Sequence, residues 1–380
     1  MDNVTHTLVG LTLARTRLGR GGRGTTIALV LASNAPDIDI VTIAGGAANY
    51  LRWHRGPTHG PLGIVFLGLI TAALVTVWHR WFDRRPDAPF ASYGRLAFIC
   101  IIGVLIHVLM DLPTSYGTRP LSPFSWHWYA EDWMPIVDIY LLAILGVCLY
   151  FGRGSALARQ QNVKIALTLM LLDYGVRGVS HHEAIALAPR VFGPTLPARC
   201  AGAPSPYFPL ESWPRPAPVN LAAGRRCLVD LAATPDAISP FSWRLIAQTS
   251  NSYETYTVDL IDPRYREAPR ENEVLWRRAV RYPNVWTAPV FAAAAAPITH
   301  LFLGFSRFPL VRTSIAPDGS ATVRWSDMRF ANGRGTPPGL GPVGAGRGAD
   351  RGIAASAGSL FGATDTVDAN GHVVEELFGR

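Results

Sequence analysis

Histidine and aspartate side chains recur through the first 138 residues of the chain, each beside an apolar run. They lie in the segments Thr5-His6, 34–39, 54–59 and 107–111, and at Asp132 and Asp138. Imidazole and carboxylate groups are ligands for divalent cations, and several carboxylates together suit a site that holds more than one ion. Ionisable groups beside membrane-length apolar runs are costly, so their default interpretation is functional. These residues predict a metal site associated with a membrane.

Two of the segments carry histidine pairs or a histidine–aspartate pair at short spacing. His107 and Asp111 are four residues apart, so on a helix both side chains reach the same ion. A histidine that only hydrogen-bonds a carbonyl is the alternative for His107. His54 and His59 flank a Gly-Pro turn, which can direct both rings inward, and Arg55 between them could bind an anionic group bidentately.

The segment Asn34-Ala-Pro-Asp37-Ile-Asp39 offers two carboxylates. In an extended segment alternation places Asp37 and Asp39 on the same side. One could bridge two ions, or one could bind metal while the other orients a histidine. A simple capping turn remains a competing interpretation for Asp39.

Two further candidates have weaker local support. His6 could be an N-terminal ligand, with Thr5 as the N-cap of the helix that follows. Asp138 lies just inside an apolar run with no cation nearby in the sequence. An unpaired carboxylate there is costly, so we expect it to contact metal or histidine.

The composition favours a membrane protein over a nucleic-acid-binding one. The 380 residues are 49% hydrophobic and only 16% charged, against about 25% charged in ordinary soluble proteins. The net charge is +8. The arginines of the chain cluster in short loops between apolar runs, as the positive-inside rule predicts, and not on one polar face. We therefore expect membrane lipid as a partner and no nucleic acid.

The apolar runs predict an all-α multi-pass membrane domain over residues 1–180. Four runs approach the ~20 residues needed to cross a bilayer: 63–78, 96–110, 136–151 and 163–179. Two shorter stretches, 7–14 and 25–35, predict an N-terminal helical hairpin. The chain starts Met1-Asp2-Asn3, without a basic n-region, so we expect no cleavable signal peptide.

The arginine-rich loops set the expected orientation. The loops 15–23, 79–95 and 152–162 should be cytoplasmic. All the candidate ligands fall at the opposite ends of the apolar runs, which predicts one site at the non-cytoplasmic face.

The second half of the chain has a different character. Strand-like alternation at 242–249, 254–260 and 321–330 predicts a small β-rich domain over residues 181–332, on the same side as the metal site. Residues 333–380, rich in Gly at their start, are expected to form a flexible tail. Cys200 and Cys227 could pair if this half is outside the cytoplasm, whereas Cys100 and Cys148 lie within apolar runs as buried small hydrophobes.

The motifs together resemble a known family, the YdjM-like, LexA-regulated inner-membrane metal-dependent hydrolases. The resemblance covers roughly residues 1–180 and rests on motifs in order: Thr5-His6, Asn34-Ala-Pro-Asp37-Ile-Asp39, His54-Arg-Gly-Pro-Thr-His59, His107-Val-Leu-Met-Asp111, Ser115-Tyr-Gly117 and Pro123-Phe-Ser125. Gly60 stands where many members have Ser, which affects no ligand. The histidine and aspartate inventory is also similar in kind to zinc-dependent phospholipase C and related nucleases.

The resemblance implies an inner-membrane hydrolase that uses one or two divalent ions, zinc above all, to activate water. The expected ligands are His6, Asp37, His54, His59, His107, Asp111 and Asp138, with Asp39 as ligand, positioning residue or base and Arg55 as a substrate anchor. A site at headgroup level makes lipid phosphoesters the expected substrates. The alternative is a non-enzymatic metal-binding membrane protein or a metal transporter, for which ligands near the bilayer midplane would be expected.

Overall fold

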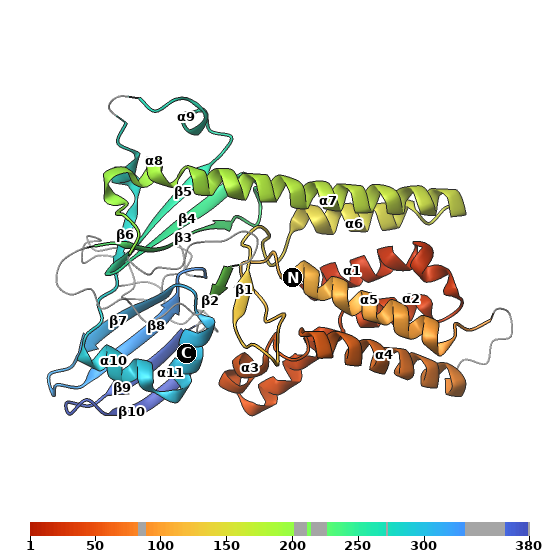
Figure 1. Ribbon diagram of the computed structural model, residues 1–380, viewed down its shortest axis with the longest axis horizontal. Coiled ribbons are helices and arrows are strands. Elements are labelled where there is room, and N and C mark those ends of the chain that lie inside the picture. Colours follow the sequence, from red (N-terminus) through yellow and green to blue (C-terminus); the bar gives the residue numbers. More distant parts are fainter. Residues whose placement is uncertain (83–88, 201–210, 214–225, 271–272, 331–361, 379–380) are drawn as a thin grey trace. The chain divides into compact units, whose positions relative to one another are not determined.

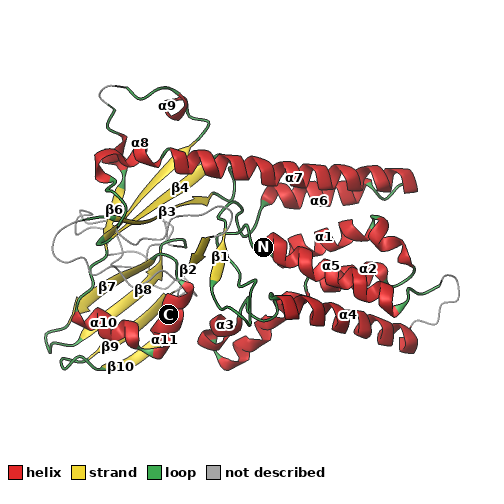
Figure 2. Ribbon diagram, in the orientation of Figure 1, coloured by secondary structure: helices red, strands yellow, loops and turns green. Residues whose placement is uncertain are grey.

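The chain forms two compact units. The computed structural model describes all residues except 83–88, 201–210, 214–225, 271–272, 331–361 and 379–380 (Figure 1). The first unit comprises residues 1–42, 53–180 and 235–240, and the second comprises 43–52, 181–234 and 241–380. Most of the long helices belong to the first unit, whereas both four-stranded sheets belong to the second (Figure 2).

The first unit is a helical bundle. Its helices are α1 (Asn3–Ala14), α2 (Thr25–Ala32), α4 (Pro61–Phe82), α5 (Tyr93–Asp111), α6 (Ile139–Phe151) and most of α7 (Ala156–Ala186); the shorter elements are η1 (Arg17–Gly21), η2 (Ala35–Gly45) and β1 (Trp128–Ala130). The expected hairpin is present as α1 and α2, which pack against each other. The N-cap of α1 is Asp2 and not Thr5, because the Asp2 carboxylate accepts hydrogen bonds from the backbone N–H groups of Val4 and Thr5.

The bundle core lies where α2, α4 and α5 meet. Leu29, Leu96, Ile99 and Val104 are fully buried there. Gly68 on α4 lets the two long helices approach closely, since a Cβ at that position would lie 2.8 Å from the Ile101 Cα. Small residues serve this purpose in helices that pack within a membrane.

Two of the described helices, α4 and α5, are long and apolar enough to cross a bilayer. The count rises to four if each of two bent pairs, α2 with η2 and α10 (Ala288–Ala295) with α11 (Pro297–Phe305), is one span. The other two expected runs correspond to α6, with 13 residues, and to part of α7, which is long but carries Asp173 and Arg177. The number of spans stays a prediction.

The second unit includes residues 43–52 and the last turns of α7, and it is built on two antiparallel sheets. The first sheet has the order β3 (Leu228–Pro235), β4 (Ser242–Thr249), β5 (Ser252–Asp259), β6 (Val280–Pro283). Phe192 of α8 (Ala188–Phe192) packs in one core with Trp243 and Val258 of this sheet. The remaining short elements are α3 (Ala47–Trp53), η3 (Gly193–Thr195), β2 (Glu211–Trp213), α9 (Pro263–Arg266) and η4 (Leu275–Arg278).

The second sheet has the order β10 (Val373–Phe378), β9 (Gly362–Val367), β8 (Ala321–Asp327), β7 (Pro309–Ile315), and α10 and α11 pack on it. This sheet corrects the expectation of a flexible tail over 333–380. Residues 362–378 form β9 and β10, because the alternating segment Ala363-Thr-Asp-Thr-Val367 buries Ala363, Asp365 and Val367 against the unit. The rest of the expected tail, up to residue 361, lies outside the described residues. The expected helical region followed by a β-rich region is otherwise confirmed.

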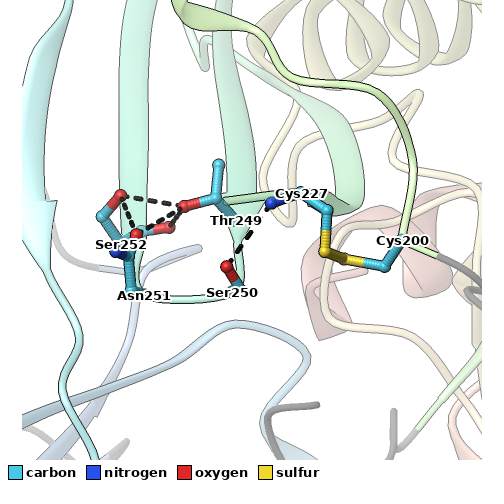
Figure 3. Close-up of a disulfide and its surroundings, with 6 residues drawn as sticks. All are labelled: Cys200, Cys227, Thr249, Ser250, Asn251 and Ser252. Atoms are coloured by element: carbon cyan, nitrogen blue, oxygen red, sulfur yellow. Dashed lines mark hydrogen bonds between the residues drawn. A yellow bond between two sulfur atoms is a disulfide. The ribbon is translucent and has the colours of Figure 1, made fainter. Parts of the chain in front are cut away.

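A disulfide joins Cys200 to Cys227 across 27 residues of sequence (Figure 3). Cys200 extends the edge of the first sheet, since its N–H donates to the Leu228 carbonyl. Cys227 is hydrogen-bonded to Ser250 at the turn between β4 and β5 (Figure 3). Cys100 and Cys148 are free thiols and are buried, as expected.

Candidate metal centre

Three helical or loop segments of the first unit bring four histidine and aspartate side chains together. His107 and Asp111 come from the last turn of α5. His59 comes from the loop just before α4, and Asp37 from η2 directly after α2. Each of these four residues offers one ligand atom, and the four atoms lie within 4.8 Å of one another.

The distances within this cluster are those of groups that face a common point without bonding to one another. His107 Nε2 lies 3.5 Å from both Asp37 Oδ1 and Asp111 Oδ2. His59 Nε2 lies 3.4 Å from Asp111 Oδ2 and 3.9 Å from Asp37 Oδ1. Three of the four residues are fully buried, so water does not surround them.

His6 of α1 adjoins the cluster. Its ring stacks on the His107 ring with centroids 3.8 Å apart, and its Nε2 lies 3.4 Å from Asp111 Oδ1. The same carboxylate oxygen accepts a hydrogen bond from the amino group of Met1. Asp111 is therefore the residue shared by all the histidines of the site.

The donor atoms of the cluster fit a bound cation. Within the described residues, Nε2 of His6, His59 and His107 and Oδ2 of Asp111 are buried and make no hydrogen bond. Leaving such atoms unsatisfied costs free energy, and a divalent ion would remove that cost. His107 Nδ1 lies 2.8 Å from the Ser33 carbonyl, so it carries the proton and Nε2 presents its lone pair to the cluster. The carbonyl contact expected for His107 is confirmed for Nδ1, and its Nε2 stays a candidate ligand.

Asp39 lies against the loop 54–58 and not in the cluster. Its Oδ1 is 3.0 Å from His54 Nδ1, and its Oδ2 accepts hydrogen bonds from the Arg55 N–H at 2.7 Å and the Thr58 hydroxyl at 3.3 Å. The segment is a 3₁₀ helix, not the expected extended strand, so Asp37 and Asp39 reach different partners. His54 uses its Nδ1 for Asp39 and is not among the four converging residues.

Arg55 is held inside the site by the protein itself. Its Nη2 lies 3.2 Å from Asp111 Oδ2, and its Nη1 donates to the Gly117 carbonyl at 2.9 Å. Its guanidinium lies 4.8 Å from the centre of the Tyr116 ring. These contacts account for the Ser115-Tyr-Gly117 motif, because that motif supplies the partners of Arg55. The φ of Arg55 is +51°, a left-handed conformation that the Asp39 hydrogen bond stabilises.

Asp138 lies apart from the cluster. Its Oδ1 caps α6 through the N–H groups of Tyr140 and Leu141, and its Oδ2 is 2.6 Å from Arg177 Nη2. The partner of this buried carboxylate is thus Arg177 on α7, 39 residues later in the sequence. Motif spacing could not predict a pair so far apart. Met1 and Ser33 are likewise site residues with no signal in the sequence pattern.

Burial keeps the histidines outside the long helices in their neutral form. It lowers the pKa of His6, His54 and His59 below the ordinary imidazole value. His107 and Arg55 lower the pKa of His59 further, whereas the hydrogen bond with Asp39 acts in the opposite direction on the pKa of His54. Neutral imidazole is the form that binds a metal.

The apolar helices and the buried His/Asp cluster define a class, a membrane protein with a candidate metal centre. Residues 1–184 match the model of the YdjM inner membrane protein family. The chain is also similar to a Bacillus subtilis (strain 168) protein named "Uncharacterized protein YfhP", with 28% identity over 172 residues. That alignment covers 41% of this chain and 48% of the relative, so the chain spans about half the length of that protein. No solved structure matches the chain.

Proposed function

We propose that the protein is a membrane-bound metal-dependent hydrolase. The observation that carries this proposal is the convergence on Asp37 and Asp111 of three buried Nε2 atoms, those of His6, His59 and His107, that make no hydrogen bond within the described residues. In a purely structural site we would expect these nitrogens to be hydrogen-bonded to side chains or to the backbone.

Asp37, His59, His107 and Asp111 would hold the ion, with His6 as a further ligand beside Asp111. Mixed nitrogen and oxygen ligands suit zinc. A bound divalent ion supplies Lewis-acid chemistry, lowering the pKa of water and polarising an ester. Arg55 fixes the orientation of Asp111, and any substrate anchoring by Arg55 would act from that position.

Asp39 and His54 form the second part of the proposed machinery. Asp39 fixes the His54 ring through Nδ1 and at the same time holds the backbone of Arg55. A carboxylate that orients an imidazole is the arrangement used for proton transfer, which makes His54 the candidate acid or base and Asp39 its positioning residue.

The site is proposed to lie at the non-cytoplasmic face. The cluster is at the C-terminal end of α5 and the N-terminal end of α4, whereas the arginine-rich loops lie at the other ends of these helices. The Cys200–Cys227 disulfide supports placing the β-rich unit in an oxidising compartment.

The alternative is a non-enzymatic metal-binding protein or a transporter. A transporter binds its ion near the bilayer midplane, within broken helices. Here Asp111 is the last residue of α5 and His59 precedes α4, so the cluster is at the helix ends. This placement favours the hydrolase.

Hydrolysis by the full chain in lipid nanodiscs tests the proposal. We expect turnover of phosphoesters that stops on chelation, returns with zinc, and is lost in His59→Ala and His107→Ala. His127→Ala is the matched control, because His127 is exposed and lies outside the cluster. Metal-saturated protein with no turnover of phosphoesters or carboxylic esters would favour the non-enzymatic alternative.

A further inference from the structure

An exposed apolar surface borders the metal centre. We call it the apolar rim, and it consists of Ile38, Ile40, Trp53, Leu121, Phe124 and Trp126. The Phe124 side chain is 76% exposed and the Trp126 side chain 43% exposed, although both are large and apolar. Burying one such side chain is worth about 1.5–3 kcal/mol, so this exposure to water would be costly.

The rim belongs to the same segments that build the site. Ile38 and Ile40 alternate with Asp37 and Asp39 on η2, with the isoleucines exposed and Asp39 buried. The Trp53 and Trp126 rings meet edge to face, with centroids 5.7 Å apart. Ile38, Ile40 and Trp53 are therefore next in sequence to Asp37, Asp39 and His54, and Trp126 joins them through its contact with Trp53.

Arg55 connects the rim to the ligands. The Arg119 N–H, at the start of the rim loop 119–126, donates to the Arg55 carbonyl at 3.1 Å. The Arg55 side chain in turn pairs with Asp111. Gly60 lies so close to the Ser122 carbonyl that any Cβ would overlap it, so this loop packs directly beside the start of α4.

The rim continues into the apolar face of a candidate span. The exposed residues of α4 recur at helical spacing from its first turn to its last: Leu62, Phe66, Ile70, Leu74, Val77, Trp78 and Trp81. Leu62 is three residues after His59. An apolar stripe on a span faces acyl chains, so the surface that meets lipid along α4 extends to the site.

The chemistry of the rim loop matches a membrane interface. Residues 119–126 contain no acidic side chain, and their one cation, Arg119, stacks on Trp128 at 4.2 Å and on Trp126 at 5.4 Å. Tryptophan is enriched at the level of lipid headgroups, where its ring is half in hydrocarbon.

We propose that the apolar rim lies in the bilayer interface and opens the metal centre to the membrane, so that the substrate is a bilayer phospholipid that enters laterally. The substrate part rests on the proposed hydrolase function; the position of the rim does not.

Depth measurement by spin labelling tests the position of the rim. Nitroxide labels would be placed at Phe124→Cys and Ile40→Cys, in full-length protein whose free Cys100 and Cys148 are replaced by Ala, in phosphatidylglycerol–phosphatidylethanolamine nanodiscs. Phe66→Cys on α4 is the lipid control, and Ile315→Cys, an exposed apolar position at the end of β7, is the water control. Relaxation by oxygen and by a water-soluble nickel chelate reports the depth of each label.

We expect the labels at residues 124 and 40 to behave as at residue 66, with oxygen the stronger relaxant. Nickel-dominated relaxation, as expected at residue 315, would overturn the proposal. So would protection from both relaxants, which would show that protein covers the rim.

A substrate comparison separates this proposal from the proposed function. With metal-loaded protein, Phe124→Asp should slow hydrolysis of a bilayer phospholipid about tenfold or more and leave hydrolysis of its water-soluble headgroup ester unchanged. Equal loss on both substrates, or faster wild-type turnover of the soluble ester, would contradict lateral entry. No hydrolysis of either, with labels in lipid, would refute the hydrolase and the substrate but not the position of the rim.

Discussion

At the scale of single residues, the site depends on carboxylates with separate tasks. Asp111 meets His6, His59, His107 and Arg55, whereas the side-chain contacts of Asp39 within the described residues are with the loop 54–59. One set of contacts would hold the ion and the other positions the residues around it.

Asp39→Asn tests this division of tasks. The amide presents N–H groups to a pocket lined by donors, so we expect a loss of about 1–3 kcal/mol in unfolding free energy and about 10- to 100-fold weaker metal binding. Competition with a chromophoric chelator measures the affinity, and thermal unfolding measures the stability. Unchanged values of both would show that Asp39 is only a turn residue.

Asp365 gives the β-rich unit a pH dependence. Burial raises its pKa to about 6, Glu376 acts in the same direction, and the hydrogen bonds from Thr299 and Trp325 only partly compensate. The folded state therefore binds this proton more tightly than the unfolded state does, and the stabilisation is complete below about pH 4 and is lost as pH rises through 6.

We expect hydrogen exchange of β9, corrected for intrinsic rate, to speed up between pH 4.5 and 7, and Asp365→Asn to remove most of that change. Asp318→Asn, an exposed carboxylate in the turn before β8, is the control and should keep it. A pH dependence identical in both variants would assign it to another group.

Much of the candidate site was readable from sequence because its spacing is local. The four-residue spacing of His107 and Asp111 became one turn of α5, and the loop 54–59 became the turn that presents His59. Asp138 was not readable, because its partner Arg177 is brought near only by the packing of α6 and α7 ends. His54 stays a predicted ligand, and the contact of its Nδ1 with Asp39, 15 residues earlier, could not be read from spacing.

At the scale of elements, apolar length predicted α4 and α5, and alternation predicted β4, β5 and β8. Composition misled at the chain end, because β9 and β10 follow a Gly-rich segment, and their order comes from the pairing of β9 with β8 and of β10 with β9. The sequence pattern also did not predict that residues 35–45 form a 3₁₀ helix, η2, where an extended segment was expected.

The packing of α4 on α5 makes a prediction about glycines. In Gly68→Ala the new Cβ would meet the Ile101 backbone. Because overpacking a close helix contact is destabilising, we expect the free energy of unfolding to fall by about 1–3 kcal/mol. Gly146→Ala on α6 has nothing within 4 Å of its Cβ and should be neutral or stabilising. Thermal unfolding in nanodiscs compares them, and equal melting temperatures would contradict the close contact.

At the scale of the whole molecule, the disulfide and the arginine-rich loops support the same orientation, with the β-rich unit outside the cytoplasm and the loops inside it. After treatment of intact spheroplasts with an impermeant reductant, we expect an impermeant maleimide to label Cys200 and Cys227. Ser155→Cys, exposed in the loop between α6 and α7, should label only after lysis. The reverse pattern would place the β-rich unit in the cytoplasm.

The most direct test of the account is the metal content of the purified full-length protein. We expect roughly one divalent ion per chain, zinc above all, for a cluster of this size. His59→Ala and His107→Ala should lose most of it, while His127→Ala should keep it. A protein that folds but carries no metal, or an equal content in all these variants, would contradict a metal centre at Asp37, His59, His107 and Asp111.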